Sequence, residues 1–291
     1  MSVSVLQHAE SSAVATEPYP YIVIRDALPE ALCDRLVADY PDPAILGVES
    51  GSNNMRWSYP GCRVAGNAAI SDSWREVIDY HMSRAFYEEF LDLFAPAVVR
   101  LFPDQFADEA ALRRLRTGRR EVDSFGQADL LLDAQICGNT PVARARSVKP
   151  NHIDSHRKLF AGLLYLRRED DDSRGGDLEV RRLRREFRGR SGCYDGVYVD
   201  DRYTELVETV PYEKNVLVMF VNSLDSLHGV TVRQPTPHPR LFMNLVGEVA
   251  RPLFQVPKTL GSRVKKLRRQ VKKRLVRLGG GEYVDPYKEV Y

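Results

Sequence analysis

The sequence predicts a mainly β protein with flanking helices: helices first, then an antiparallel β body, then a helical tail. Apolar side chains follow helical spacing within residues 29–115, and again along residues 260–278. Between them, residues 128–249 are short apolar runs divided by turns rich in Gly, Pro and Asn. Short strands at this spacing are typical of a sandwich or barrel rather than of alternating β-α units.

The composition is that of an ordinary globular protein. The chain has 291 residues, of which 43% are hydrophobic and 28% are charged. Its apolar runs are too short to span a bilayer, and its N-terminus lacks the basic start and apolar core of a secretory signal. The four cysteines form no CxxC pair, which favours free thiols. These features predict a cytoplasmic protein.

The first part of the chain is expected to be helical, with one strand in front. Residues 1–17 are small and polar without periodicity, and disorder is predicted for them. Ser71 to Ser73 can supply a helix cap. The elements expected next are a strand at Tyr19–Ile24, a helix at Pro29–Tyr40, a loop at Gly47–Gly66, a helix from Trp74 to about Phe94, and a helix from Pro103 to about Leu115.

The β body and the helices before it are expected to form one domain, residues 18–256, followed by a tail at residues 257–291. Extended runs alternate with turns through this body. The expected strands are Ala128–Ile136, Leu159–Leu166, Leu178–Val180, Tyr203–Val210, Val216–Val221 and Leu241–Val249.

A candidate metal site begins at His152 and Asp154. In an extended strand these two side chains point to the same side, because side chains alternate between faces. A rival arrangement pairs His152 with His156 on a helix, at the spacing of a zinc site. Pro150 and the β-like segment at residues 159–166 disfavour a helix there.

A third ligand is available at His228. It stands at a strand edge 74 residues beyond Asp154, and a barrel can bring such distant strand ends together. Two histidines and one carboxylate leave three octahedral positions open, an arrangement typical of non-haem Fe(II) oxygenases. Of the other histidines, His8 lies in the predicted disordered segment, His81 within a helix and His238 in a turn.

With these residues in order, the chain resembles the 2-oxoglutarate/Fe(II)-dependent dioxygenase superfamily, in particular its prolyl-hydroxylase-like and phytanoyl-hydroxylase-like members. The similarity extends over roughly residues 18–250, starting with the PYIVIRDALPEALCDRLV entry segment. The fragments that carry it further are HID at 152–154, GGDLEV at 175–180, NVLVMFVNSLDSLHGV at 215–230 and PRLFMNLVGEV at 239–249.

The resemblance implies a double-stranded β-helix, or jelly roll, with iron held by His152, Asp154 and His228. It implies Fe(II), 2-oxoglutarate and O2 as cofactors, with ascorbate as an accessory, and hydroxylation of a small molecule with release of succinate and CO2. A carbohydrate or a secondary metabolite is the substrate class we expect.

Arg240, twelve residues after His228, is expected to pair its guanidinium with the distal carboxylate of 2-oxoglutarate. Arg233 is a competing candidate for this role, but it lies in a Pro-rich turn. Gln135, Lys158 and Asn244 are candidate pocket contacts, and a purely structural role for each stays open.

The tail is strongly basic. Ten Lys and Arg residues lie between Lys258 and Arg277 without an acidic residue, so subtracting them from the net charge of +2 leaves −8 for the rest of the chain. The apolar stripe predicts a basic amphipathic helix, which either packs on the acidic body or a second subunit, or contacts a membrane or polyanion through residues 258–278. The absence of interleaved aromatic residues disfavours single-stranded nucleic acid as its ligand.

Two other functions stay open. The chain could be a catalytically inactive β-barrel that binds a membrane or polyanion through the basic tail. It could also be a cupin-like metal enzyme that does not use 2-oxoglutarate. Arg240 would then have no co-substrate to bind.

Overall fold

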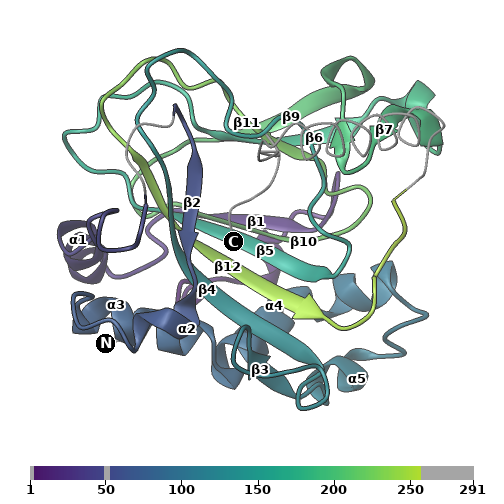
Figure 1. The fold of residues 1–291 in the computed structure, drawn as a ribbon. Helices are drawn as coiled ribbons and strands as arrows, with labels where there is room; N and C mark the ends of the chain where they lie inside the picture. The colour runs from purple at the N-terminus through teal and green to yellow at the C-terminus, as the bar shows by residue number, and fades with distance from the viewer. Residues whose placement is uncertain (1–2, 49–52, 257–291) are drawn as a thin grey trace, which may run out of the picture.

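Two mainly antiparallel sheets face one another in the protein, and helices cover the outer side of the larger one (Figure 1). The computed structural model describes residues 3–48 and 53–256. The helices are α1 (Glu30–Ala38), α2 (Gly61–Val64), α3 (Asp72–His81), α4 (Arg84–Leu101) and α5 (Glu109–Arg113), with 3-10 turns η1 (Ser11–Ala13), η2 (Arg185–Phe187), η3 (Ser191–Cys193) and η4 (Asp201–Tyr203). The strands are β1 (Tyr21–Ile24), β2 (Arg56–Tyr59), β3 (Thr117–Arg119), β4 (Leu130–Asn139), β5 (Lys158–Tyr165), β6 (Leu178–Leu183), β7 (Tyr194–Asp195), β8 (Tyr198–Val199), β9 (Thr204–Val210), β10 (Leu217–Val221), β11 (His228–Val230) and β12 (Arg240–Val249).

The chain passes back and forth between the two sheets. The larger sheet has the order β1-β10-β5-β12-β4-β2, with β3 added to β4, and the smaller sheet has the order β11-β6-β9. β12 lies at the centre of the larger sheet, antiparallel to both β4 and β5. This mostly β path between facing sheets is consistent with a jelly roll, and it agrees with the expected body of short antiparallel strands.

The main hydrophobic core lies between the larger sheet and the helices. Alternate residues of β4, β5, β10 and β12 point into it, as the period of two along a strand requires. Phe90 of α4 stacks on Phe160 of β5, with 4.3 Å between ring centroids. A second core fills the space between the sheets and is rich in aromatic side chains, including Tyr165, Tyr212, Phe220 and Phe242.

The helix expected from Trp74 to about Phe94 is two helices, α3 and α4. Ser71 caps the first as expected, since its hydroxyl accepts a hydrogen bond from the backbone N–H of Trp74 at 3.5 Å. Ser83 caps the second by accepting from the N–H of Phe86 at 3.4 Å. One continuous helix was expected because the apolar spacing is kept on both sides of the break at Met82.

The prediction of a loop at Gly47–Gly66 is wrong for the second half of that range, which contains β2 and α2. β2 adds to the edge of the larger sheet beside β4. Trp57 is buried there, and it lies over Gly138, where a Cβ atom would stand 2.6 Å from the indole. Tertiary pairing therefore forms a strand where local composition favours a turn.

The disorder expected for residues 1–17 is contradicted from residue 3 onward. Val5 and Leu6 are buried in the main core. The backbone N–H of Val5 donates to Nε2 of His81 at 3.1 Å, and the hydroxyl of Ser4 donates to Glu89. A few apolar side chains with buried partners order this segment despite its polar composition.

Other differences are smaller. The helix expected at Pro103–Leu115 is the short α5, capped by Asp108, whose carboxylate accepts from the N–H of Ala111 at 2.6 Å. β3 and β11 have three residues each, too few to show a period in the sequence. The predicted tail helix lies outside the described residues. No helix within residues 3–48 and 53–256 has the length and apolarity to cross a membrane.

His81 predicts a pH dependence of stability. Burial lowers its pKa from 6.5 to about 4, and this outweighs the hydrogen bond from Nδ1–H to the carbonyl of Val77 at 2.7 Å, which alone would raise the pKa. Nε2 accepts from the backbone N–H of Val5 at 3.1 Å. The unfolded chain therefore binds this proton more readily, so the stability present above pH 6.5 is lost as the pH falls toward 4. We expect a loss of about 2 kcal/mol between pH 7 and pH 5 from this group.

Urea unfolding gives the free energy of unfolding of wild type and of His81→Gln at pH 7 and at pH 5. The contribution of His81 is the difference between the two proteins in how much this free energy falls. The exposed His8, changed to Gln, is the control. An equal pH dependence in wild type and His81→Gln would show that His81 contributes nothing.

Candidate metal centre

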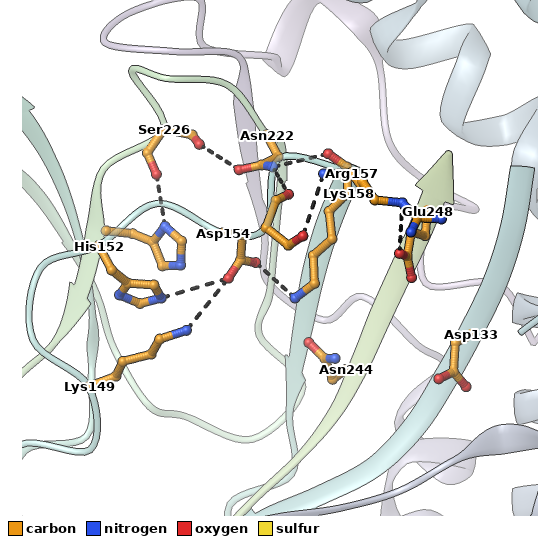
Figure 2. A network of polar contacts seen from close by, with 12 residues as sticks. Asp133, Lys149, His152, Asp154, Arg157, Lys158, Asn222, Ser226, Asn244 and Glu248 are labelled. Atoms are coloured by element: carbon orange, nitrogen blue, oxygen red, sulfur yellow. Dashed lines mark hydrogen bonds and ion pairs between the residues drawn. The ribbon is translucent and has the colours of Figure 1, made fainter. Parts of the chain in front are cut away.

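His152, Asp154 and His228 come together from two distant segments of the chain. Figure 2 labels His152 and Asp154 at this site. The backbone N–H of His152 donates to the carbonyl of His228 at 2.9 Å, and the N–H of His228 donates back to the carbonyl of His152 at 3.0 Å. The two imidazole centroids lie 4.2 Å apart. One ligand atom from each of the three residues lies within 4.8 Å of the others.

The tautomer of each histidine follows from its backbone neighbour. Nδ1 of His152 lies 2.8 Å from the carbonyl oxygen of Pro150, and Nδ1 of His228 lies 2.9 Å from that of Ser226. A carbonyl oxygen only accepts, so each Nδ1 carries the proton and each Nε2 carries a lone pair. Such an outer hydrogen bond is the usual companion of a metal-ligating histidine.

Charge at the site favours metal binding. Burial would raise the pKa of Asp154, but Lys158 and Lys149 outweigh burial and hold that pKa well below its usual range. Burial, followed by the charge of Lys149, lowers the pKa of His152, and burial also lowers that of His228. The carboxylate is therefore ionised and both imidazoles are neutral, which are the forms that bind metal.

The two oxygens of Asp154 have different neighbours. Oδ1 lies 3.8 Å from Nε2 of His152 and 3.7 Å from Nζ of Lys149, whereas Oδ2 accepts from Nζ of Lys158 at 3.2 Å. One oxygen thus faces the imidazoles while the other is held by an ammonium. Two imidazole nitrogens and one carboxylate oxygen, all nearly buried, fit a divalent first-row metal ion.

The alternative zinc pair of His152 with His156 is wrong. Residues after Asp154 form a turn that leads into β5, so no helix brings the two rings to one side. His156 is absent from the ligand cluster found in the described part of the chain.

Arg240 lies between the two sheets and is 1% exposed. Its Nε donates to the carbonyl of Gly176 at 2.7 Å, and its Nη2 donates to the hydroxyl of Tyr165 at 2.9 Å. The rings of Tyr165, Phe242 and Tyr212 surround the guanidinium with centroids 4.8, 5.0 and 5.4 Å from its carbon. Within residues 3–48 and 53–256, no carboxylate forms an ion pair with it.

Gly176 explains the GGDLEV fragment. It has a φ of +94°, a backbone conformation that favours glycine, and a Cβ there would stand 3.1 Å from Cδ of Arg240. The missing side chain therefore lets the backbone carbonyl of Gly176 approach the guanidinium.

Arg233, the competing candidate, is also fully buried, but its partners are neutral oxygens of neighbouring loops. Nη1 donates to Oδ1 of Asn54 at 2.8 Å and to the carbonyl of Thr140 at 3.1 Å, and Nη2 donates to the carbonyl of His238 at 2.8 Å. Burial, and then the charge of Arg240, lowers its pKa to about 10. This guanidinium links the segments at residues 54, 140 and 238.

Gln135 and Asn244 face each other across β4 and β12. Nδ2 of Asn244 donates to Oε1 of Gln135 at 2.9 Å, and Nε2 of Gln135 donates to Oδ2 of Asp133 at 2.7 Å. Figure 2 shows Asn244 between the metal ligands and Asp133. Each amide therefore has a structural hydrogen bond, and both lie on the strands that flank the site.

Three further residues have no role predicted from the sequence. Asp133 is the one acidic residue of β4, and burial raises its pKa. That lone acidic residue within LLLDAQI was a usable signal. Lys149 sits in an irregular segment, and Tyr165 ends an apolar strand, so nothing local distinguished either one.

A cavity of about 910 Å³ lies elsewhere, lined by Trp57, Thr140 and several prolines of the segments at 141 and 235–239. None of the three ligands lines it. We therefore do not assign it to the metal centre.

Comparison with known proteins gives structural likenesses only. No family model matches the chain, and no curated protein matches it. Among solved structures, it is similar to a prolyl-4-hydroxylase from Pseudomonas putida, with 14% identity and a TM-score of 0.44 over 82% of this chain and 98% of that one.

Two further structures have comparable similarity. A prolyl 4-hydroxylase from Phytophthora capsici has 17% identity and a TM-score of 0.43, over 94% of this chain and 75% of that one. HygX from Streptomyces hygroscopicus, with nickel and 2-oxoglutarate bound, has 15% identity and a TM-score of 0.38, over 91% of each chain. The case for the metal centre rests on its own geometry.

The ligand set predicts metal binding that depends on Asp154. We expect Asp154→Ala to weaken Co(II) binding by more than the roughly 10–100-fold that loss of an outer partner costs, because a direct ligand is removed. Isothermal titration of metal-free protein measures this. Asp172→Ala, which changes an exposed carboxylate, is the matched control. Equal Co(II) affinity in wild type and Asp154→Ala would contradict the assignment.

Proposed function

We propose that the protein is a 2-oxoglutarate- and Fe(II)-dependent oxygenase that hydroxylates a small molecule with release of succinate and CO2. The observation that carries the proposal is the convergence of two neutral imidazoles and one ionised carboxylate, and it is supported by Arg240, a buried guanidinium that has no carboxylate partner among the described residues. The first feature suits Fe(II), and the second suits a carboxylate-bearing co-substrate.

In this proposal His152, Asp154 and His228 hold Fe(II) through Nε2, Oδ1 and Nε2. When bound, Fe(II) with 2-oxoglutarate and O2 supplies the oxidising chemistry, in which decarboxylation of 2-oxoglutarate is coupled to oxidation of the substrate. The protein orients its ligands in advance, because the carbonyls of Pro150 and Ser226 fix both rings.

Arg240 is the proposed anchor for the distal carboxylate of 2-oxoglutarate. A buried cation without a counter-ion is costly, and a carboxylate that accepts two parallel N–H bonds would offset that cost. Tyr165 supports this role, since its hydroxyl lies 2.9 Å from Nη2 of Arg240 and can donate its own proton to the same carboxylate. Arg233 is a weaker candidate because both of its Nη atoms donate at 2.8 Å to loop oxygens, whereas Nη1 of Arg240 has only a long contact of 3.5 Å with Oδ1 of Asn139 among the described residues.

Aromatic packing supports the exclusion of water. The ring of Phe220 lies 4.7 Å from that of His228, and Phe242 and Tyr212 flank Arg240. Apolar walls of this kind lower the local dielectric and strengthen the charge pairing of Arg240 with an anion.

The first test is turnover of the co-substrate. We expect the protein with Fe(II) and ascorbate to form succinate from 2-oxoglutarate, and Asp154→Ala to lose this activity to background. Succinate is quantified by mass spectrometry, with metal-free protein as the blank. Full turnover by Asp154→Ala would refute the ligand assignment.

The second test concerns Arg240. We expect Arg240→Met to raise KM for 2-oxoglutarate by about 10–100-fold, the ratio given by losing a charge-assisted pair worth about 1.5–3 kcal/mol. Arg240→Lys keeps the charge but loses the planar guanidinium. We expect its KM for 2-oxoglutarate to lie between those of wild type and Arg240→Met. Co(II) binding and thermal stability of each variant establish that it is folded. An unchanged KM in folded Arg240→Met would remove Arg240 from the co-substrate site.

A further inference from the structure

One buried amide beside Arg240 has almost no hydrogen-bond partner. Asn139 ends β4, and its side chain is fully buried. Its Nδ2 donates no hydrogen bond to any residue that the structure describes, and its Oδ1 has one long contact, 3.5 Å from Nη1 of Arg240. Burying an amide without hydrogen bonds is costly, so nearly all buried polar groups in proteins are paired. An acceptor from outside the protein would offset this cost.

Asn139 and Arg240 are direct neighbours across two strands. In the antiparallel register of β4 and β12, Asn139 stands opposite Arg240, and opposite residues share a face of the sheet. Cys137 and Phe242, each two positions further along its strand, belong to the core between the two sheets. Because side chains alternate along a strand, Asn139 and Arg240 face that same space.

The guanidinium fixes which way the amide is turned. A guanidinium nitrogen only donates, so the atom of Asn139 that faces Nη1 of Arg240 is the oxygen. Nδ2 is bonded to the same carbon as Oδ1, so the unpaired donor lies close to the guanidinium. Nη1 is also the least engaged nitrogen of Arg240, because Nε donates at 2.7 Å and Nη2 at 2.9 Å. Two donors with spare capacity therefore lie near one another.

The pair formed by Arg233 and Asn54 shows the same combination in a structural role. Nη1 of Arg233 donates to Oδ1 of Asn54 at 2.8 Å, and Nδ2 of Asn54 donates to the carbonyl of Arg146 at 2.9 Å. Both ends of that amide are thus paired within the protein. Between Arg240 and Asn139 the contact is 3.5 Å instead, and the amide nitrogen has no acceptor among the described residues. This difference favours a ligand at the second pair.

We propose that Nδ2 of Asn139 donates a hydrogen bond to the distal carboxylate of 2-oxoglutarate, and that Asn139 thereby helps to select a 2-oxo acid with a terminal carboxylate. This inference rests on the proposed function and adds a specificity-determining residue to the site. A carboxylate has about four lone-pair sites, enough for donors from Arg240, Tyr165 and Asn139 together. The ligand then supplies the acceptor that the amide lacks in the free protein.

The test separates the distal carboxylate from the rest of the co-substrate. 2-Oxopentanoate has the same carbon chain as 2-oxoglutarate, with a methyl group in place of the distal carboxylate. Each acid is titrated into Co(II)-loaded protein, and its Kd is obtained from the visible spectrum of Co(II). We expect Asn139→Leu to raise the Kd of 2-oxoglutarate about tenfold, because a hydrogen bond to a charged group is lost. The Kd of 2-oxopentanoate is expected to stay as in wild type.

Two further variants serve as controls. Asn67→Leu removes an amide whose nitrogen donates to the hydroxyl of Tyr59 at 3.2 Å, and it is expected to bind both acids as wild type does. Asn139→Ala is measured in the same way, since it removes the same donor without the bulk of Leu. Co(II) affinity and urea unfolding establish that each variant is folded.

The inference is overturned if folded Asn139→Leu and Asn139→Ala bind 2-oxoglutarate as tightly as wild type. It is also overturned if the Kd values of both acids rise by the same factor, since Asn139 would then affect the whole site rather than the distal carboxylate. Equal binding of the two acids by wild type would show that the distal carboxylate is not recognised at all. Failure of wild type to bind Co(II) or 2-oxoglutarate would instead refute the proposed function.

Discussion

The pair of backbone hydrogen bonds between His152 and His228 is the constraint on which the metal centre depends. It joins a segment that precedes β5 to the start of β11, 76 positions later in the sequence. Because the bridge fixes both main chains, and the carbonyls of Pro150 and Ser226 fix both rings, the two Nε2 atoms are oriented before any metal arrives. Asp154 completes the set from the same side of the chain as His152.

The facing sheets also hold charges that a protein interior seldom tolerates. Arg240 is surrounded by aromatic rings and has neutral partners, and Arg233, which lies near it, has no carboxylate partner among the described residues. Such guanidiniums are expensive to bury, so their presence indicates either a strong structural need or an anionic ligand. Arg233 links three loops, whereas Arg240 is the anchor that we propose for the carboxylate of the co-substrate. At the metal site, Lys149 and Lys158 lie 3.7 and 3.2 Å from the oxygens of Asp154.

The sequence was informative wherever a local pattern carried the structure. The spacing of His152 and Asp154, the position of His228 after a strand and the place of Arg240 at the start of β12 were all predictable, and the structure brings the three ligands together. Features that depend on tertiary pairing were not predictable. β2 forms because it pairs with β4 at the edge of the larger sheet. Residues 3–6 are ordered because they donate a hydrogen bond to His81 and pack in the main core. Lys149 lies in an irregular segment, so only the fold reveals that it faces Asp154.

The proposed function requires one site that binds Fe(II) and 2-oxoglutarate together. An anaerobic titration of the Fe(II)-loaded protein with 2-oxoglutarate, followed by visible absorption, measures this directly. A 2-oxo acid that chelates Fe(II) gives a charge-transfer band, so we expect a band that saturates at one 2-oxoglutarate per iron in wild type. If protein that retains its iron gives no such band, Fe(II) and 2-oxoglutarate do not share a site.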